Sequence, residues 1–306
     1  AAMGGGKKRG RNKNKKGESE GDKNVWKHPK KEGDAKKGGW SNYNLNNDAY
    51  VGYYKGLGIV PEDEVEAFVS TLRKPLPITF RINGSGKYAD HMKNRLRKDF
   101  LEGLDLTNVT LEGGEPVSPP MPLPWYPNEV AWQMSFSRNQ LRKEKVLEEL
   151  FEFIKAAADA GTITRQEAVS MVPPLFLDVK PGHAVLDMCA APGSKTFQIL
   201  EMLHGGGELA TFEPEGFVVA NDIDPKRCNL LTHQTKRMCS PALVVANHDA
   251  QRFPSLPSAE EEEGRAFDRV LADVPCTGDG TLRKNADIWA KWHTNMGCQM
   301  HKLQLA

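Results

Sequence analysis

Four short apolar segments alternate with helical segments in the second half of the chain. They read HAVLDM (183–188), GFVVAND (216–222), ALVVAN (242–247) and FDRVLAD (267–273). The first two are followed by SKTFQILEMLH and PKRCNLLTHQTKRM, whose apolar residues recur at helical spacing. Apolar strands separated by helices are typical of a parallel sheet that is covered on both faces. The pattern therefore predicts a doubly wound α/β sheet in residues 183–306.

An acidic residue ends or follows each of these strands. In chain order they are Asp187, Asp222, Asp249 and Asp273. The carboxyl ends of parallel strands share one edge of the sheet, and ligands bind at that edge where the strand order reverses. A single aspartate there is equally well explained as a helix cap, which is our interpretation of Asp224. Four acidic residues at successive strand ends predict a ligand site.

The loop after the first strand, within LDMCAAPGSKT (186–196), narrows the choice of ligand. The phosphate-binding pattern G-x-x-x-x-G-K-[ST] is absent, because Ser194 separates Gly193 from Lys195. The dinucleotide pattern G-x-G-x-x-G is also absent, since no glycine stands in the five residues before Gly193. Acidic strand ends suit a ligand with ribose hydroxyls and a positive charge but no phosphates. S-adenosylmethionine is such a ligand, and we predict it as the cofactor.

The first 44 residues are rich in Gly, Lys and Asn. Residues 1–40 hold 13 Lys and Arg against 5 Asp and Glu, although the whole chain has a formal charge of only +1. So few apolar residues predict disorder. The charge favours an electrostatic arm for nucleic acid, or a nuclear targeting segment, and the alternative is a solvated tail.

Residues 45–120 predict a small N-terminal α+β domain. VPEDEVEAFVSTLRK (60–74) and YADHMKNRLRKDFLEGL (88–104) have helical spacing, and PITFRI (77–82) between them has the composition of a strand. This module contains no catalytic motif.

Residues 121–182 predict a connector followed by helices. PVSPPMPLPWYPNEVAW (116–132) predicts an extended connector, with the domain boundary near residue 120. Ser137 is a candidate cap for a long helix that runs through Leu141 and Leu147 and ends at Gly161.

Two further helices are predicted from local signals. Thr164 and Glu167 fit a capping box, and Pro173 with Pro174 would end the helix that it begins. DIWAKWHTNMGCQMHKLQLA (287–306) predicts a single helix whose packing residues are Ile288, Trp289 and Trp292.

The five cysteines form no C-x-x-C pair, and no other metal-ligand spacing is present, so we predict free thiols and no metal. No apolar run approaches the ~18 residues of a membrane span, and we predict a protein without a membrane segment.

Three of the segments together resemble a known family. DMCAAPGSKT (187–196), NDIDPKR (221–227) and ADVPCTGDGTLRKN (272–285) are similar to the leading motifs of the RNA cytosine-5 methyltransferases, which include the bacterial ribosomal RNA enzymes. The similarity to the eukaryotic multisite tRNA branch rests on LPWYP (123–127), TRQEAVSMVPPLFLDVKPGH (164–183) and VVANHDA (244–250). The resemblance spans about residues 45–306 and implies a class I, Rossmann-like methyltransferase sheet.

The resemblance also implies roles for individual residues. Asp222 would hold the ribose hydroxyls, Asp249 would lie beside the adenine, and Asp273 would flank the target base and the cofactor amine. The loop that would wrap the methionine part of S-adenosylmethionine consists of Cys189, Ala190, Ala191, Pro192, Gly193, Ser194 and Lys195.

The implied reaction is methylation of cytosine C5, which requires a thiolate to add to C6 first. In the resembled family the attacking cysteine belongs to a Thr-Cys pair, and the Pro-Cys cysteine, here Cys276, assists product release. Asp273 would bond the base, and Lys195 is a cation that can lower a nearby thiol pKa. Cys298 follows Gly297 and not a threonine, so we expect a chain truncated at its C-terminus, with an incomplete sheet and no activity of its own. The alternatives are Cys276 as nucleophile, as in the DNA cytosine-5 enzymes, or a non-catalytic RNA-binding fragment.

The expected substrate is RNA, with tRNA favoured. The target base must leave its stack, which costs a few kcal/mol, and contacts from a basic surface to the backbone supply binding energy. The tail, KNRLRK (93–98) and RKEK (142–145) are candidates for these contacts. We expect a nuclear location, with the nucleolus and the cytoplasm as alternatives.

Overall fold

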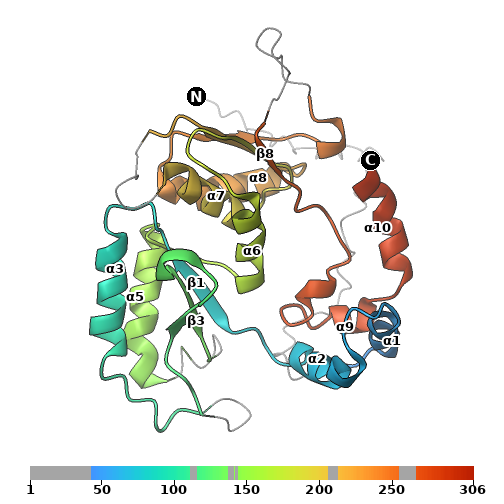
Figure 1. Ribbon diagram of the computed structural model, residues 1–306, viewed down its shortest axis with the longest axis horizontal. Helices are drawn as coiled ribbons and strands as arrows, with labels where there is room; N and C mark the ends of the chain where they lie inside the picture. Colours follow the sequence, from blue (N-terminus) through green and yellow to red (C-terminus); the bar gives the residue numbers. More distant parts are fainter. Residues whose placement is uncertain (1–42, 111–115, 137–140, 142–143, 206–212, 255–266) are drawn as a thin grey trace, which may run out of the picture. The chain divides into compact units, whose positions relative to one another are not determined.

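The computed structural model describes residues 43–110, 116–136, 141, 144–205, 213–254 and 267–306 (Figure 1). The basic tail that we predicted to be disordered, apart from its last two residues, lies outside these ranges. The described ranges all belong to one compact unit, Tyr43–Ala306.

A parallel sheet forms from the four apolar segments that we predicted as strands. Within the described residues its order is β7-β6-β5-β8. The strands are β5 (Ala184–Asp187), β6 (Phe217–Asn221), β7 (Leu243–Ala246) and β8 (Arg269–Leu271). Val185 pairs with Val218 on one side and with Arg269 on the other. The strand order therefore reverses at β5, and the loops after β5 and β8 leave the sheet at this switch point.

Three helices accompany these strands. They are α6 (Ala168–Leu177), α7 (Ser194–His204) and α8 (Pro225–Thr235). Most residues of α7 are buried, and Ile199, Leu200 and Leu203 join Val185 and Val218 in one apolar core. Asp224 caps α8 as predicted, because its carboxylate accepts a hydrogen bond from the backbone N–H of Lys226 at 2.8 Å.

A second, antiparallel sheet lies in the N-terminal half and has the order β2-β3-β1-β4. Its strands are β2 (Met121–Pro122), β3 (Ala131–Met134), β1 (Ile78–Ile82) and β4 (Ile163–Arg165). Its core includes side chains from α3 (Ala89–Arg95), the π-helical turn η3 that continues it (Leu96–Leu101), and α5 (Glu148–Asp159). Short 3-10 turns are η4 (Pro127–Glu129) and η5 (Lys145–Leu147).

The predicted connector was wrong, since β2 and β3 lie within it or directly at its end. The boundary that we placed near residue 120 falls inside this sheet, because β1 precedes it and three strands follow it. The prolines of this segment were the reason that we predicted no strands there. Pro122 is tolerated in β2 because β2 is an edge strand, where an N–H is not needed for pairing.

The capping box at Thr164 was also wrong. Thr164 lies in β4 opposite Arg81, and no side chain of the described residues caps α6. Pro173 and Pro174 lie inside α6 and do not end it. Proline 174 cannot donate to the carbonyl of Ser170, and the side chain of Gln166 donates to that carbonyl instead, at 2.9 Å.

The helix that we predicted from Ser137 to Gly161 is not continuous, because Leu141 is helical but the backbone leaves the helical conformation at Glu144. Ser137 lies outside the described residues, Glu144 has an extended backbone, and α5 starts at Glu148 after a 3-10 turn. The predicted end is confirmed, since Gly161 follows α5 with a φ of +75°.

Helices from the two ends of the described chain share a third apolar core (Figure 1). They are α1 (Asp48–Gly56), α2 (Val65–Leu72), α9 (Ile288–Lys291) and α10 (Asn295–Leu305), and the 3-10 turn η2 (Glu62–Glu64) precedes α2. The single helix predicted over 287–306 was wrong, because Trp292 has an extended backbone that separates α9 from α10. The packing role of Ile288, Trp289 and Trp292 is confirmed.

A buried polar cluster joins the antiparallel sheet to α7. Arg81 on β1 donates to the Glu201 carboxylate on α7 and, at 2.9 Å, to the side-chain carbonyl of Gln166. Gln198 on α7 donates to the Tyr126 hydroxyl at 3.1 Å. An ion pair withdrawn from water requires such additional hydrogen bonds, so these contacts constrain the orientation of α7.

We predict that Gly161→Ala destabilises the protein by at least about 2 kcal/mol, because alanine disfavours a positive φ. A Cβ at Gly161 would also lie 2.5 Å from the carbonyl oxygen of Arg237. Gly52→Ala in the middle of α1 is the matched control. Apart from its chain neighbours and the backbone of α1, a Cβ at Gly52 would lie more than 4 Å from the atoms of the other described residues, and the substitution should stabilise the protein by about 0.5 to 1 kcal/mol. Urea denaturation measures both changes, and equal effects would contradict the prediction.

Candidate active site

The loop after β5 is fixed against the neighbouring strand ends. Ala190 donates its backbone N–H to the carbonyl of Asn221 at 2.7 Å, and Met188 donates to the carbonyl of Leu271 at 2.9 Å. Gly193 ends the loop with a φ of +106° at the start of α7, and a Cβ there would lie 2.8 Å from the Leu231 side chain. Glycine is therefore required at this position on both conformational and steric grounds.

Asp187 is the buried acid at the end of β5. Its Oδ2 accepts a hydrogen bond from the Thr196 hydroxyl at 2.7 Å, and its Oδ1 has no partner among the described residues. Burial raises the pKa of Asp187 to about 6, and the negative charges of Asp273 and Asp222 act in the same direction. An unpartnered buried carboxylate oxygen is costly, so this oxygen is a candidate ligand contact.

Asp222 follows β6 and is almost completely buried, with 1% of its surface exposed. It accepts hydrogen bonds from the backbone N–H of Ala191 at 3.3 Å and from that of Asp224 at 3.1 Å. Arg227 lies 3.3 Å from its Oδ2. The loop after β5 and the end of β6 are thus held together through this carboxylate.

Lys195 and Asp273 connect the two sides of the switch point. Lys195, in the first turn of α7, lies 2.7 Å from Oδ2 of Asp273, which follows β8. The Lys195 side chain is 15% exposed and that of Asp273 is 55% exposed. The carboxylate of Asp273 is therefore open to a ligand while the lysine holds it in place.

The two cysteines of interest have different environments. Cys189 is half-buried, and burial raises the pKa of its thiol, with a further increase from the charges of Asp222 and Asp187. Cys276 is exposed, and its Sγ accepts a hydrogen bond from the backbone N–H of Gly278 at 3.4 Å. Of the two, Cys276 is the more accessible thiol.

Asp249 lies beyond the end of β7, where it caps the 3-10 turn η8 (Ala250–Arg252). Its carboxylate accepts from the backbone N–H of Gln251 at 3.1 Å. No hydrogen bond within the described ranges links it to Asp187, Asp222 or Asp273, so its predicted place beside an adenine stays a prediction.

Asn221 is a structural residue of the site that the sequence analysis did not identify. It is fully buried and donates to the carbonyls of Met188 at 3.0 Å and His248 at 2.9 Å. Its side-chain oxygen accepts from the backbone N–H of His248 at 2.9 Å. The available sequence signal was a polar amide at the end of an apolar strand. In the structure the Asn221 side chain ties together the ends of β5, β6 and β7.

The sheet order, the glycine loop at the switch point and the acid after β6 define a class I, Rossmann-like methyltransferase domain. The 16S rRNA methyltransferase RsmB/F family matches residues 174–306. This part of the chain is therefore a methyltransferase domain of that family, which confirms the predicted fold class and family.

Curated relatives match a longer part of the chain. The chain is 47% identical over 270 residues to the multisite-specific tRNA:(cytosine-C(5))-methyltransferase of Saccharomyces cerevisiae, covering 87% of this chain and 38% of that protein. It is 42% identical over 267 residues to the tRNA (cytosine(34)-C(5))-methyltransferase of Drosophila melanogaster, covering 85% and 35%. The chain thus spans less than half the length of these relatives.

Solved structures agree on the fold. NSun6 from Pyrococcus horikoshii with SFG has a TM-score of 0.58 at 17% identity, covering 84% of this chain and 77% of that chain. The structure of PH0851 has a TM-score of 0.56 at 22% identity, covering 85% and 51%. At these identities the likeness concerns the fold alone.

The described ranges contain neither a candidate metal site nor a candidate membrane-spanning helix. No group of three His, Cys, Asp or Glu side chains there has an arrangement suited to a metal ion. No helix in the same ranges has the length and apolar character needed to cross a membrane.

We predict that the contribution of Asp187 to the free energy of unfolding decreases as pH rises from about 4 to 7. Its pKa is about 6 in the folded protein and near 3.8 in an ordinary setting, so the folded state binds more protons between these values. Stability is therefore highest below about pH 4 for this group and falls by up to about 3 kcal/mol by pH 6 to 7. Asp187→Asn should remove this dependence in urea denaturation at pH 4 to 7. Parallel curves for the two proteins would contradict it.

Proposed function

We propose that the chain is the cofactor-binding part of an enzyme that methylates cytosine C5 in RNA, with tRNA as substrate. The carrying observation is the cluster of carboxylates at the switch point, in which Asp187 has an unpartnered oxygen and Asp273 is open to solvent. The relatives from yeast and fly support the substrate class, since both are named as tRNA cytosine-C5 methyltransferases.

The residues present fit S-adenosylmethionine. The charges of Asp222 and Asp273 both act on Asp187, while Lys195 pairs with Asp273 and Arg227 with Asp222. The net negative charge favours a cationic ligand and disfavours phosphates. Asp222 would accept from the ribose hydroxyls, and the loop Cys189–Lys195 would wrap the methionine part. When bound, the cofactor supplies an electrophilic methyl group on a sulfonium sulfur.

Three side chains of this chain would take part in the reaction, namely Asp273, Lys195 and Cys276. Asp273, held by Lys195, would accept a hydrogen bond from the target base, and Cys276 would assist release of the methylated product. The family's attacking Thr-Cys cysteine has no counterpart at Cys298, which follows Gly297. Cys276 as nucleophile is the second candidate, and its exposure together with the Gly278 N–H directed at its sulfur favours it.

We predict that Asp222→Asn weakens S-adenosylmethionine binding about 10- to 100-fold, because a hydrogen bond to a charged group contributes about 1.5 to 3 kcal/mol. Asp268→Asn is the matched control. Asp268 lies at the opposite, amino end of β8, where it accepts from the Ala184 N–H at 2.8 Å. Isothermal titration calorimetry on the 306-residue chain measures all three proteins. Absence of binding by the unsubstituted chain would refute the cofactor proposal.

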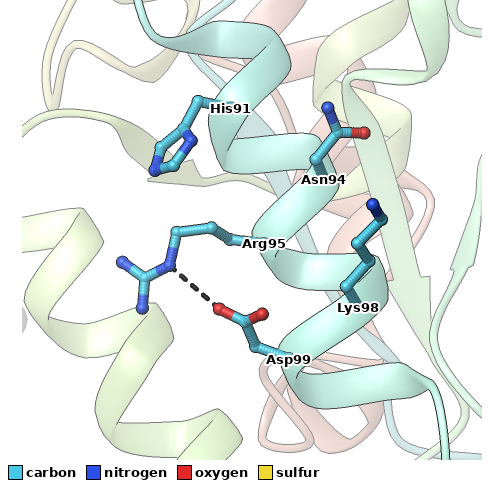
Figure 2. Close-up of a pocket in the computed structure, with 5 residues that line it drawn as sticks. All are labelled: His91, Asn94, Arg95, Lys98 and Asp99. Atoms are coloured by element: carbon cyan, nitrogen blue, oxygen red, sulfur yellow. Dashed lines mark hydrogen bonds and ion pairs between the residues drawn. The ribbon is translucent and has the colours of Figure 1, made fainter.

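For RNA, we propose a docking surface on the exposed face of α3 and η3, which we call the basic helix face. Figure 2 shows His91, Arg95 and Lys98 along it, and Arg95 lies 3.1 Å from Asp99. An open depression of about 420 Å³ is lined by this face. The guanidinium of Arg95 also lies 5.3 Å from the centre of the Phe153 ring, which orients it.

Charge supports this surface. Residues 87–102 carry five Lys and Arg against three Asp and Glu. Phosphate contacts of this kind supply binding energy without reading sequence. The basic residues 1–40 would add to the same attraction, and their composition is also the basis for proposing a nuclear location.

We predict that Lys98→Glu lowers tRNA affinity at least about threefold and reduces the slope of log affinity against log salt concentration by about one. Lys180→Glu is the control. Lys180 is exposed like Lys98, but it pairs with Asp178 before β5, at the amino end of the parallel strands. Fluorescence anisotropy with labelled tRNA at several salt concentrations measures both. An equal effect of the two substitutions would remove the basic helix face as the docking surface.

A further inference from the structure

The carboxylate of Asp279 receives side-chain hydrogen bonds from three separate segments of the described chain. Tyr54 on α1 donates its hydroxyl to Oδ2 at 2.7 Å. Trp292, directly after α9, donates its ring N–H to Oδ1 at 2.8 Å, and the hydroxyl of Thr277 donates to the same oxygen. Four or so acceptor positions are available on a carboxylate, so this one is largely occupied by protein donors.

Asp279 belongs to the same short turn as Cys276. Thr277, which is bonded to Asp279, is the residue after Cys276. The Gly278 N–H donates to the Cys276 sulfur at 3.4 Å, and the Thr281 N–H donates back to the Gly278 carbonyl at 2.8 Å. The direction of the Gly278 N–H toward the thiol thus depends on a turn whose conformation Asp279 fixes through Thr277.

The N-terminal segment holds this region through further contacts. The side chain of Asn47 donates to the carbonyls of Trp289 at 2.8 Å and Trp292 at 2.9 Å. Arg283, downstream of the turn, donates to the carbonyls of Lys74 and Pro75, each at 2.9 Å. These bonds span more than 200 residues of sequence, so the residue that caps α1 and the residues that follow α2 hold the segment after Cys276 in place.

Tyr50 packs against the two aromatic side chains, Tyr54 and Trp292, that donate hydrogen bonds to Asp279. Tyr50 is buried and packs edge-on against Trp292, with ring centres 5.0 Å apart. Burial raises the pKa of Tyr54, and the hydrogen bond to Asp279 raises it further. The Tyr54 hydroxyl therefore remains a proton donor over the working pH range, and its bond to Asp279 persists.

We propose that Asp279 is a positioning residue that orients the Cys276 thiol, and that Tyr54 on the N-terminal helix α1 acts through it. The inference rests on the proposed function only for the role of Cys276 itself. The contacts that hold the turn are properties of this chain. Helix α1 is then part of the apparatus that presents the thiol, although it lies outside residues 174–306, which the methyltransferase family matches.

The test is the alkylation rate of Cys276 by iodoacetamide at fixed pH, resolved by peptide mass spectrometry. The rate for Cys239, an exposed cysteine after η7 (Lys236–Met238), serves as the internal reference. The Gly278 N–H stabilises the Cys276 thiolate by donating a hydrogen bond to its sulfur. Tyr54→Phe should lower the alkylation rate of Cys276 about three- to tenfold, because the turn no longer holds this N–H against the sulfur. Tyr53→Phe is the matched control, since within the described structure its hydroxyl makes no hydrogen bond, and it should leave the rate unchanged.

A second pair of variants separates positioning from folding. Thr277→Val removes the hydroxyl at nearly constant volume and should lower the rate as Tyr54→Phe does, and Thr277→Ser should restore it. Unchanged or raised rates in Tyr54→Phe and Thr277→Val would overturn the proposal, as would an equal loss in Thr277→Ser. Alkylation requires neither cofactor nor RNA, so such a result would leave the methyltransferase proposal standing. If the unsubstituted chain failed to bind S-adenosylmethionine but showed the expected alkylation pattern, the cofactor proposal would fail and the positioning role of Asp279 would stand.

Discussion

The parallel pairing of β5 with both β6 and β8 is the constraint on which the site depends. The strand order reverses at β5, so β6 and β8 lie on its two sides. The loop after β5 therefore leaves the sheet between these two neighbours. The backbone bonds from Ala190 and Met188 to the ends of β6 and β8 then fix that loop. The positions of Asp187, Asp222 and Asp273 follow from this arrangement.

The charges at this edge of the sheet explain its chemical preference. Asp187 and Asp222 are buried and of like sign, Arg227 lies beside Asp222, and Lys195 pairs with the more exposed Asp273, so the three carboxylates outnumber the two cations. A cation is therefore favoured where a pyrophosphate would be repelled, which agrees with the absence of both phosphate-binding glycine patterns. Burial raises the pKa of the Cys189 thiol, and the charges of Asp222 and Asp187 raise it further. Cys276 is exposed and is the more accessible of the two thiols.

Residues that precede the parallel sheet in sequence contact residues 174–306 at two separate points. Arg81 and Gln166 contact α7 from one side, and Asn47 and Tyr54 contact the segment after Cys276. Buried polar contacts of this kind have strict geometric requirements, because an unpaired partner would be left without water. The methyltransferase family matches residues 174–306, yet the residues that orient α7 and the Cys276 turn come partly from outside that range.

The sequence alone determined the parallel strands, the helices α7 and α8 and the acidic strand ends, because each depends on local periodicity and capping. It did not reveal β2, β3 and β4, which are short segments: β3 and β4 become strands by pairing with β1, and the proline-containing β2 by pairing with β3. Nor did it reveal Asn221 or Asp279, since a polar side chain becomes structural only when partners from distant segments surround it. Those partners are brought together by tertiary packing, in which Tyr54 and Asp279 meet across 225 residues.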